Sequence, residues 1–169
     1  MGAAVAALKP VFRQVFVVTR DKASLPDLGV EILEDDHPLQ GPLVGVVRGL
    51  SHCNAGWCFI AACDMPFLSV AVIKGMATNL TDCDALIPEI NGRLQTLHAF
   101  YSKSCLPIAE ELLSVGDTSI YALASRCCVV KLGEDNFQDQ ADELKSFRDL
   151  DTTAEYQDAI SETGDSSAE

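Results

Sequence analysis

The sequence predicts one α/β domain in which a mainly parallel sheet is covered by helices on both faces, forming three layers. Short runs of apolar, β-branched residues alternate along the chain with segments of helical composition, an order typical of parallel strands joined by crossover helices. Residues 57–62 carry almost no polar side chain, as expected for a strand that is buried on both faces. A chain of 169 residues, 48% of them hydrophobic, can also bury one substantial core.

Each element follows from the local pattern. The predicted strands are residues 15–19, 30–33, 57–62, 84–90, 97–102, 127–132 and 147–150. The predicted helices are residues 3–12, 43–53, 69–80, 104–115 and 118–124, with a short one from Thr153. Ser69 suits the N-cap of its helix, and Asn91-Gly92 suits a hairpin turn that leads towards an antiparallel strand. Residues 1–160 are expected to form the domain, and residues 161–169 a disordered acidic tail.

Charge and cysteine content exclude several classes of protein. The formal net charge is −13, and twelve acidic and two basic residues follow Leu132. The remainder is therefore nearly neutral and has no basic patch for a nucleic acid. No run is long and apolar enough to span a membrane, and the first basic residue, Lys9, follows the apolar start instead of preceding it. We therefore expect a cytoplasmic protein whose seven cysteines are buried, reduced thiols without metal-binding spacing.

Two predicted strands end at acidic residues. Asp35 follows one strand, and Asp64 follows the other, with Pro66 stopping the chain just beyond it. In open α/β sheets, ligands bind beyond the carboxyl ends of the strands. A carboxylate there can hold Mg²⁺, which often takes one or two carboxylates together with substrate phosphates. A turn aspartate that caps the next helix would give the same local pattern.

A second candidate segment lies between a strand end and a helix. Gly41, Pro42 and Leu43 precede the predicted helix, where backbone N–H groups can meet an anion or the edge of a base. An ordinary junction between a loop and a helix has the same composition.

The ordered set of these segments closely resembles the molybdenum cofactor guanylyltransferase (MobA-like) family, from about Val15 to Ala159. The matching pieces are Asp35, Gly41-Pro42-Leu43-Val44-Gly45, Ala62-Cys63-Asp64-Met65-Pro66-Phe67, Gly92-Arg93-Leu94-Gln95-Thr96-Leu97-His98-Ala99-Phe100-Tyr101 and Phe147-Arg148-Asp149-Leu150-Asp151-Thr152. The resemblance implies a Rossmann-like nucleotidyltransferase that transfers GMP from GTP to molybdopterin with Mg²⁺ and releases pyrophosphate. Related cytidylyl and sugar-phosphate nucleotidylyl transferases share this plan and remain alternatives.

The resemblance also assigns roles to individual residues. Asp64 matches the ligand of Mg²⁺, and Asp35 matches an aspartate that contacts the guanine nucleotide. Thr19 stands where the family usually has an asparagine near the nucleotide. On the pterin side, Arg93 and Gln95 match the Gly-Arg-x-Gln piece, and Asp149 and Asp151 replace two asparagines, which adds negative charge. His98 is interpreted as a packed strand residue.

The family's opening strand and glycine-rich loop, with a lysine that holds the triphosphate, have no counterpart in this sequence. The resemblance therefore implies that a first strand and loop are missing, through a gene start set too late, a true fragment, or a loop supplied by a partner. Without them the neighbouring strands would lose ladder partners. GTP and molybdopterin are the expected substrates, and molybdoenzymes or other cofactor-biosynthesis proteins the expected partners. An inactive remnant that binds a nucleotide or a partner is the alternative of another class.

Overall fold

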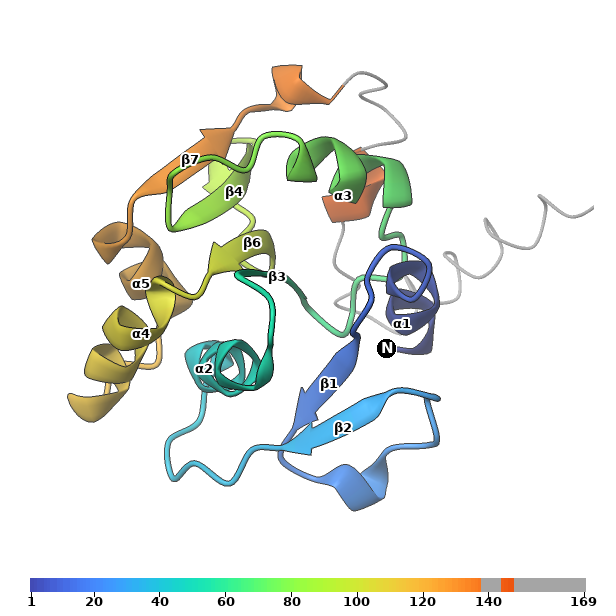
Figure 1. Cartoon of the computed structure of the whole chain (residues 1–169), viewed down its shortest axis with the longest axis vertical. Helices are drawn as coiled ribbons and strands as arrows, with labels where there is room; N and C mark the ends of the chain where they lie inside the picture. Colours follow the sequence, from blue (N-terminus) through green and yellow to red (C-terminus); the bar gives the residue numbers. More distant parts are fainter. Residues whose placement is uncertain (138–143, 148–169) are drawn as a thin grey trace, which may run out of the picture.

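Two sheets form the framework of the computed structural model, which describes residues 1–137 and 144–147 (Figure 1). The smaller sheet pairs β1 (Phe16–Thr19) in parallel with β2 (Glu31–Glu34). The larger sheet has the order β3-β6-β4-β5, and β7 also pairs with β4. Its strands are β3 (Trp57–Ala61), β4 (Ala85–Ile90), β5 (Arg93–Leu94), β6 (His98–Ser102) and β7 (Val129–Leu132).

The prediction of a mainly parallel sheet is only partly confirmed. Two ladders of the described residues are parallel, β1 with β2 and β4 with β7. The ladders that join β3 to β6, β4 to β6 and β4 to β5 are antiparallel. The short connection explains this, because only a few residues separate β4 from β6, whereas a parallel return needs a crossover of a dozen or more. As a result β3, β4 and β7 run in one direction and β6 runs against them.

Helix α2 (Pro42–His52) connects the two sheets. In the described residues, β1 has a ladder only with β2 and β3 only with β6, so no ladder joins the sheets. The helix packs against both β1 and β3. Gly49 faces β1, since a Cβ atom on it would lie 3.4 Å from the ring of Phe16. Packing of side chains, and not backbone pairing, therefore holds β1 and β2 beside the larger sheet.

Helices cover both faces of the larger sheet, as the sequence predicts (Figure 1). On one face α2 lies with α4 (Cys105–Ser114) and α5 (Ile120–Arg126). On the other lie α3 (Val70–Ala77) and the 3-10 helix η3 (Leu144–Phe147). Alternation along β4 separates the two cores: Ala85 and Ile87 belong to the first, and Leu86 to the second.

The remaining helical segments are short. They are α1 (Gly2–Leu8), η1 (Lys22–Ser24) and η2 (Glu134–Asn136). Helix α1 packs on the segment after β3, where Ala4 meets the buried side chains of Met65 and Leu68. This contact fixes the stretch of chain that follows Asp64.

Local signals of the sequence are confirmed at two turns. The hydroxyl of Ser69 accepts a hydrogen bond from the N–H of Val72 at 3.3 Å, which caps α3 as expected. Asn91 and Gly92 both have positive φ, 50° and 71°, and join β4 to β5 as a hairpin turn.

The predicted strand at residues 147–150 is not confirmed. Phe147 ends a 3-10 helix, and residues 148–150 lie outside the described residues, as do Thr153 and the acidic tail. None of the helices in residues 1–137 and 144–147 combines the length and hydropathy that a membrane span requires.

Candidate active site

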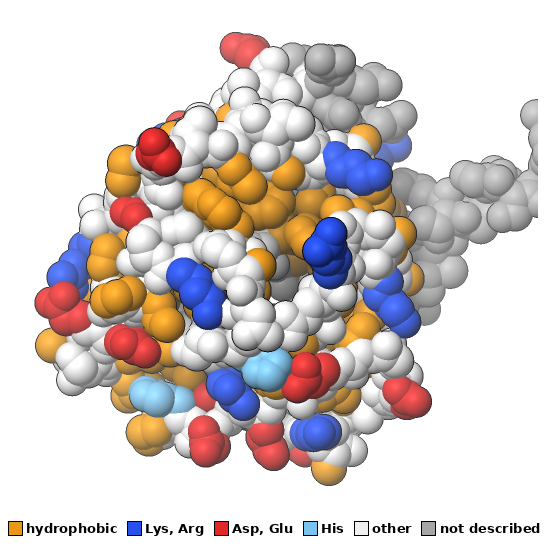
Figure 2. Space-filling model, in the orientation of Figure 1, with side chains coloured by type: hydrophobic (Ala, Val, Ile, Leu, Met, Phe, Trp, Pro, Cys, Tyr) orange, Lys and Arg blue, Asp and Glu red, His pale blue; other side chains and the backbone are white. Residues whose placement is uncertain are grey.

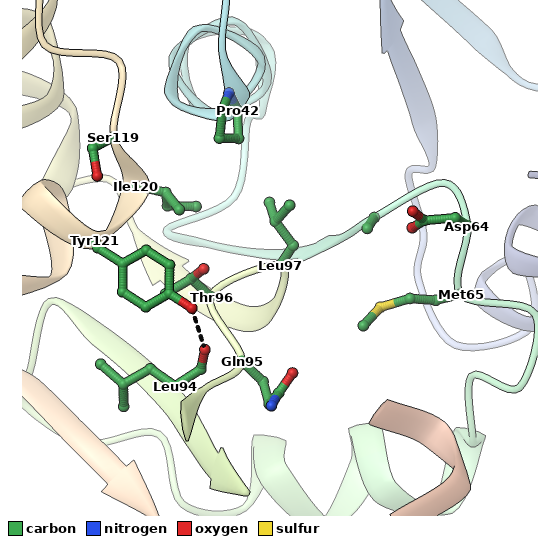
Figure 3. A pocket seen from close by; sticks show the side chains of 11 residues that line it. Pro42, Asp64, Met65, Leu94, Gln95, Thr96, Leu97, Ser119, Ile120 and Tyr121 are labelled. Atoms are coloured by element: carbon green, nitrogen blue, oxygen red, sulfur yellow. Dashed lines mark hydrogen bonds between the residues drawn. The ribbon is translucent and has the colours of Figure 1, made fainter. Parts of the chain in front are cut away.

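A cavity of about 310 Å³ opens at the carboxyl end of β3 (Figure 3). Its walls come from the segment after β3, the segment before β6, and the first residues of α2 and α5. The residues that line it are Pro42, Ala62, Asp64, Met65, Leu94, Gln95, Thr96, Leu97, Ser119, Ile120 and Tyr121. Its position beyond a strand end agrees with the location that the sequence predicts for a ligand.

The antiparallel pairing of β3 with β6 brings two of these walls together. Ala61 pairs with His98, and beyond them the N–H of Ala62 donates to the carbonyl of Leu97 at 2.9 Å. The chain before β6 therefore lies beside the chain after β3. This register sets Gln95 and Thr96 near Asp64, although about thirty positions separate them in the sequence.

Asp64 is exposed in the turn after β3, and its carboxylate faces the cavity in Figure 3. The next residue, Met65, is buried against α1, which fixes the turn. Within residues 1–137 and 144–147, Asp64 is the only carboxylate that lines the cavity.

The beginning of α2 is held by the loop before α5. The N–H of Leu43 donates to the carbonyl of Thr118 at 3.3 Å. Gly41 has φ of 144°, and a Cβ atom on it would lie 2.6 Å from Oγ1 of Thr118. The close contact between Gly41 and Thr118 therefore places Pro42 and Ser119 on the same cavity.

The structure corrects the expectation for Leu43. Its side chain is fully buried in the core between α2 and the sheet, and its N–H is already used by Thr118. Neither group is available to a nucleotide. The pattern of the sequence could not separate Leu43 from its neighbours, because the first turn of this helix faces the core on one side and the cavity on the other. Of the three residues, only Pro42 lines the cavity.

Thr19 and Asp35 lie together, but outside the lining of this cavity. Thr19 is the last residue of β1, and Asp35 comes directly after β2, which pairs with β1. The N–H of Asp35 donates to the carbonyl of Thr19 at 2.7 Å. The side chain of Asp35 is largely buried and accepts a hydrogen bond from the N–H of His37 at 3.0 Å. Arg20 steadies the loop beyond by donating to the carbonyl of Leu39 at 2.9 Å. The structure therefore has two candidate groups, one at the end of β1 and β2 and one at the end of β3.

The pterin-side candidates separate in the same way. Gln95 lines the cavity, and its N–H donates to the carbonyl of Pro88 at 2.8 Å. Arg93 lies on β5 with an exposed side chain and does not line the cavity. Asp149 and Asp151 lie outside the described residues.

Reasoning from the sequence missed the wall formed by α5. Ser119 caps this helix by accepting a hydrogen bond from the N–H of Ala122 at 3.3 Å. Tyr121 follows in the first turn, and its hydroxyl donates to the carbonyl of Leu94 at 3.2 Å (Figure 3). The N-cap serine marks the start of α5 in the sequence, but only the contact between Gly41 and Thr118 shows that this start faces Asp64.

The donor set suits a magnesium ion held mainly by substrate. The described residues contain no group of three or more histidine, cysteine, aspartate or glutamate side chains that could enclose a metal. One exposed carboxylate in a cavity open to a polyphosphate is the arrangement that Mg²⁺ commonly uses, since it retains waters and substrate oxygens as ligands. Asp64 therefore fits the role of a magnesium ligand.

His98 lies behind the cavity, not in it. It is fully buried on β6, with its ring edge-on to Phe59 at 5.2 Å between centroids. The interpretation of His98 as a packed strand residue is confirmed.

The seven cysteines are all free, but they are not all buried. Cys53 and Cys105 are buried, whereas Cys63 and Cys128 are exposed. The expectation of buried thiols is therefore wrong for these last two, which follow strand or helix ends where the chain turns at the surface, and Cys58, Cys83 and Cys127 are only partly buried.

Comparison with known proteins agrees with this geometry. Residues 1–129 match the family model described as the MobA-like NTP transferase domain. A Clostridium perfringens protein named "Probable molybdenum cofactor guanylyltransferase" is 29% identical over 151 residues, covering 88% of this chain and 76% of that protein. The molybdenum cofactor guanylyltransferase of Desulfosudis oleivorans is 34% identical over 121 residues, covering 71% and 60%.

A solved structure shows the same arrangement of elements. It is the molybdopterin-guanine dinucleotide biosynthesis protein A of Archaeoglobus fulgidus, which is 26% identical and superposes with a TM-score of 0.80 over 96% of this chain and 84% of that one. With the family model covering residues 1–129, this chain belongs to the MobA-like NTP transferase domain family, a family of nucleotidyltransferases.

Proposed function

We propose that this protein transfers GMP from GTP to the terminal phosphate of molybdopterin and requires Mg²⁺. The observation that carries the proposal is Asp64, which among the described residues is the one carboxylate that lines the cavity at the end of β3, in a chain of the MobA-like family. The names of its relatives support guanylyl transfer as the reaction.

The reaction is an in-line displacement at phosphorus. An oxygen of the acceptor phosphate forms a bond to the α-phosphorus of GTP, the bond from that phosphorus to the bridging oxygen breaks, and pyrophosphate leaves. No protein nucleophile is needed, so the rate comes from positioning and electrostatic stabilisation. When bound, Mg²⁺ supplies charge neutralisation for the phosphate oxygens.

The residues of this chain would act by holding the reactants. Asp64 would hold the Mg²⁺ that neutralises the phosphates, and the turn that carries it is fixed by Met65 against α1. Gln95, with Thr96, lies on the same cavity and suits the acceptor side. Asp35 and Thr19, at the ends of β2 and β1, would contact the guanine nucleotide from the neighbouring strand ends.

The test is a transfer assay on the whole chain with GTP, molybdopterin and Mg²⁺, following pyrophosphate release and dinucleotide formation. Asp64→Asn should lower the rate by about 10²-fold or more, the usual loss when one stabilising group is removed from a charged transition state. The matched control is Asp82→Asn, which changes an exposed acid that does not line the cavity.

The same assay separates the alternatives. Equal loss of activity in both variants, or none in Asp64→Asn, would show that Asp64 is not the metal ligand. Faster turnover with CTP than with GTP would favour the cytidylyl reaction. Binding of GTP by calorimetry without any turnover would indicate a nucleotide-binding remnant. Cytoplasmic location, and the lack of nucleic-acid and membrane partners, stay predictions from the sequence.

A further inference from the structure

Tyr121 presents an aromatic ring to the cavity. Its side chain is 56% exposed, whereas most large apolar side chains of the domain are buried. It stands in the first turn of α5 and forms the wall opposite the segment that carries Asp64 (Figure 3).

The ring is held in one orientation although it is exposed. At its base, α5 is capped by Ser119. At its tip, the hydroxyl donates to the carbonyl of Leu94, which joins α5 to the end of the β4–β5 hairpin. A tyrosine has only two side-chain torsions, so an anchor at each end leaves little entropy to lose when a ligand binds.

The ring of Tyr121 and the carboxylate of Asp64 lie at different ends of the cavity (Figure 3). Leu94 lies near the ring, and the side chain of Met65 lies near the carboxylate. The carboxamide of Gln95 lies between the two ends and offers one acceptor oxygen and an N–H donor. A ligand that is flat and apolar at one end and carries phosphates at the other fits this order.

One face of the domain leaves apolar side chains at the surface. In Figure 2, hydrophobic side chains gather in a hollowed area near the middle of the view, bordered by separate lysine or arginine side chains.

We propose that Tyr121 is a specificity-determining residue whose ring stacks on the fused heterocycle of the ligand, with Gln95 reading its polar edge and the phosphates directed to Asp64. Guanine and pterin share the chemistry required, a flat bicycle whose amino and oxo groups flank a ring N–H. The inference rests on the proposed function for its choice of ligand. It adds the residue that selects a planar ring over a sugar acceptor.

The test measures binding of two separate probes, GMP and unsubstituted pterin, to the whole chain. Calorimetry serves for GMP, and quenching of the pterin's own fluorescence serves for pterin. Tyr121→Leu removes the ring and keeps apolar bulk, and it should weaken binding of the stacked probe about tenfold, as expected for loss of one ring–base stack. Tyr121→Phe keeps the ring and loses only the bond to Leu94, so it should retain most of the affinity. Val115→Ala, at another exposed apolar side chain (75%) away from the cavity, is the control.

Each outcome decides the inference. If Tyr121→Leu weakens binding of pterin alone, the ring of Tyr121 stacks on the acceptor. If it weakens binding of GMP alone, the ring stacks on the nucleotide. If Tyr121→Leu weakens binding of both probes, and the probes compete, the ring of Tyr121 recognises the bicyclic ring system that they have in common. Unchanged binding in Tyr121→Leu, equal weakening in Val115→Ala, or no binding of either probe to the unaltered chain overturns it.

Failure of the proposed function looks different. If the unaltered chain binds a probe through Tyr121 but transfers no nucleotide, the transfer proposal fails and the stacking role of Tyr121 stands. If transfer depends on Asp64 but KM for both substrates is the same in Tyr121→Leu, the stacking role fails and the transfer proposal stands.

Discussion

The rings of His98 and Phe147 lie 4.4 Å apart, centroid to centroid, at the contact between β6 and η3. His98 is fully buried there, and neither ring nitrogen has a hydrogen-bond partner of normal geometry among the described residues. Burial lowers the pKa of His98 to about 3, an effect that the backbone of Ser146 only partly offsets. The histidine is therefore neutral in the folded protein at any pH near 7.

This burial predicts acid sensitivity. The unfolded chain binds a proton at His98 near pH 6.5, but the folded chain does not until about pH 3. The unfolded state therefore binds more protons between these two pH values. The free energy of unfolding is not reduced by this effect above pH 6.5, and below pH 6.5 it falls by up to about 1.4 kcal/mol per pH unit. Urea unfolding at pH 7.5, 6.5, 5.5 and 5.0 measures the slope, and His98→Leu should reduce it.

A second measurement separates this effect from carboxylates that titrate at lower pH. The proton NMR signal of the His98 ring should not shift between pH 8 and 5. A titration of that signal near pH 6.5, or an unchanged slope in His98→Leu, would contradict the account.

The contact between Gly41 and Thr118 predicts a specific cost of adding one methyl group. In Gly41→Ala the new Cβ would lie 2.6 Å from Oγ1 and 2.7 Å from Cβ of Thr118, at a φ of 144° that side chains rarely adopt. We expect a loss of about 1–3 kcal/mol in the free energy of unfolding, from strain and the forced shift of the loop. Because that loop places Pro42 at the cavity, substrate binding should weaken as well.

Gly45→Ala is the matched control, because it makes the same change inside α2. A Cβ atom there meets nothing within 4 Å, so this variant should be stabilised by about 0.5–1 kcal/mol. Chemical unfolding of both variants decides the matter. Equal effects of the same sign would show that helix propensity, and not the contact with Thr118, controls the result.

The sequence predicted most elements because their signals are local. The β-branched run that ends at Thr19 and the apolar run from Trp57 are strands. Ser69 caps α3, and the Asn91-Gly92 pair forms the turn, both at the predicted positions. The antiparallel direction of β6 was also predicted, from the hairpin turn at Asn91-Gly92, whereas the expectation of a mainly parallel sheet came from the alternation of elements. Only the tight hairpin after β4 forces β6 to return antiparallel.

The site was less predictable because it depends on contacts between distant segments. Asp64 is marked by its position after a buried strand, which the sequence shows. Tyr121 carries no such mark, since its place at the cavity follows from the approach of Thr118 to Gly41, far apart in the chain. Leu43 fails for the related reason that a short motif does not tell which of its residues faces the core.

Asp84 ties together three turns at the end of the sheet opposite the cavity. Its carboxylate accepts hydrogen bonds from the hydroxyl of Ser104 and from the N–H of Cys128, the latter at 2.8 Å. These bonds, that of Ser104 first, lower the pKa of Asp84, and the slight burial opposes them. The group stabilises the fold where it is ionised, that is, above its ordinary pKa of about 3.8.

Asp84→Ala should therefore reduce the free energy of unfolding by about 1 kcal/mol at pH 7, a value kept low because the side chain is partly exposed to solvent. As pH falls through the lowered pKa of the folded state, the carboxylate is protonated and the difference between the two proteins should shrink. Thermal unfolding at pH 7, 4 and 3 tests this, with Asp82→Ala, an exposed acid two positions earlier, as the control. A difference between Asp84→Ala and the unaltered protein that is the same at pH 7 and pH 3 would mean that side-chain packing, and not the charge held by Ser104 and Cys128, carries the contribution.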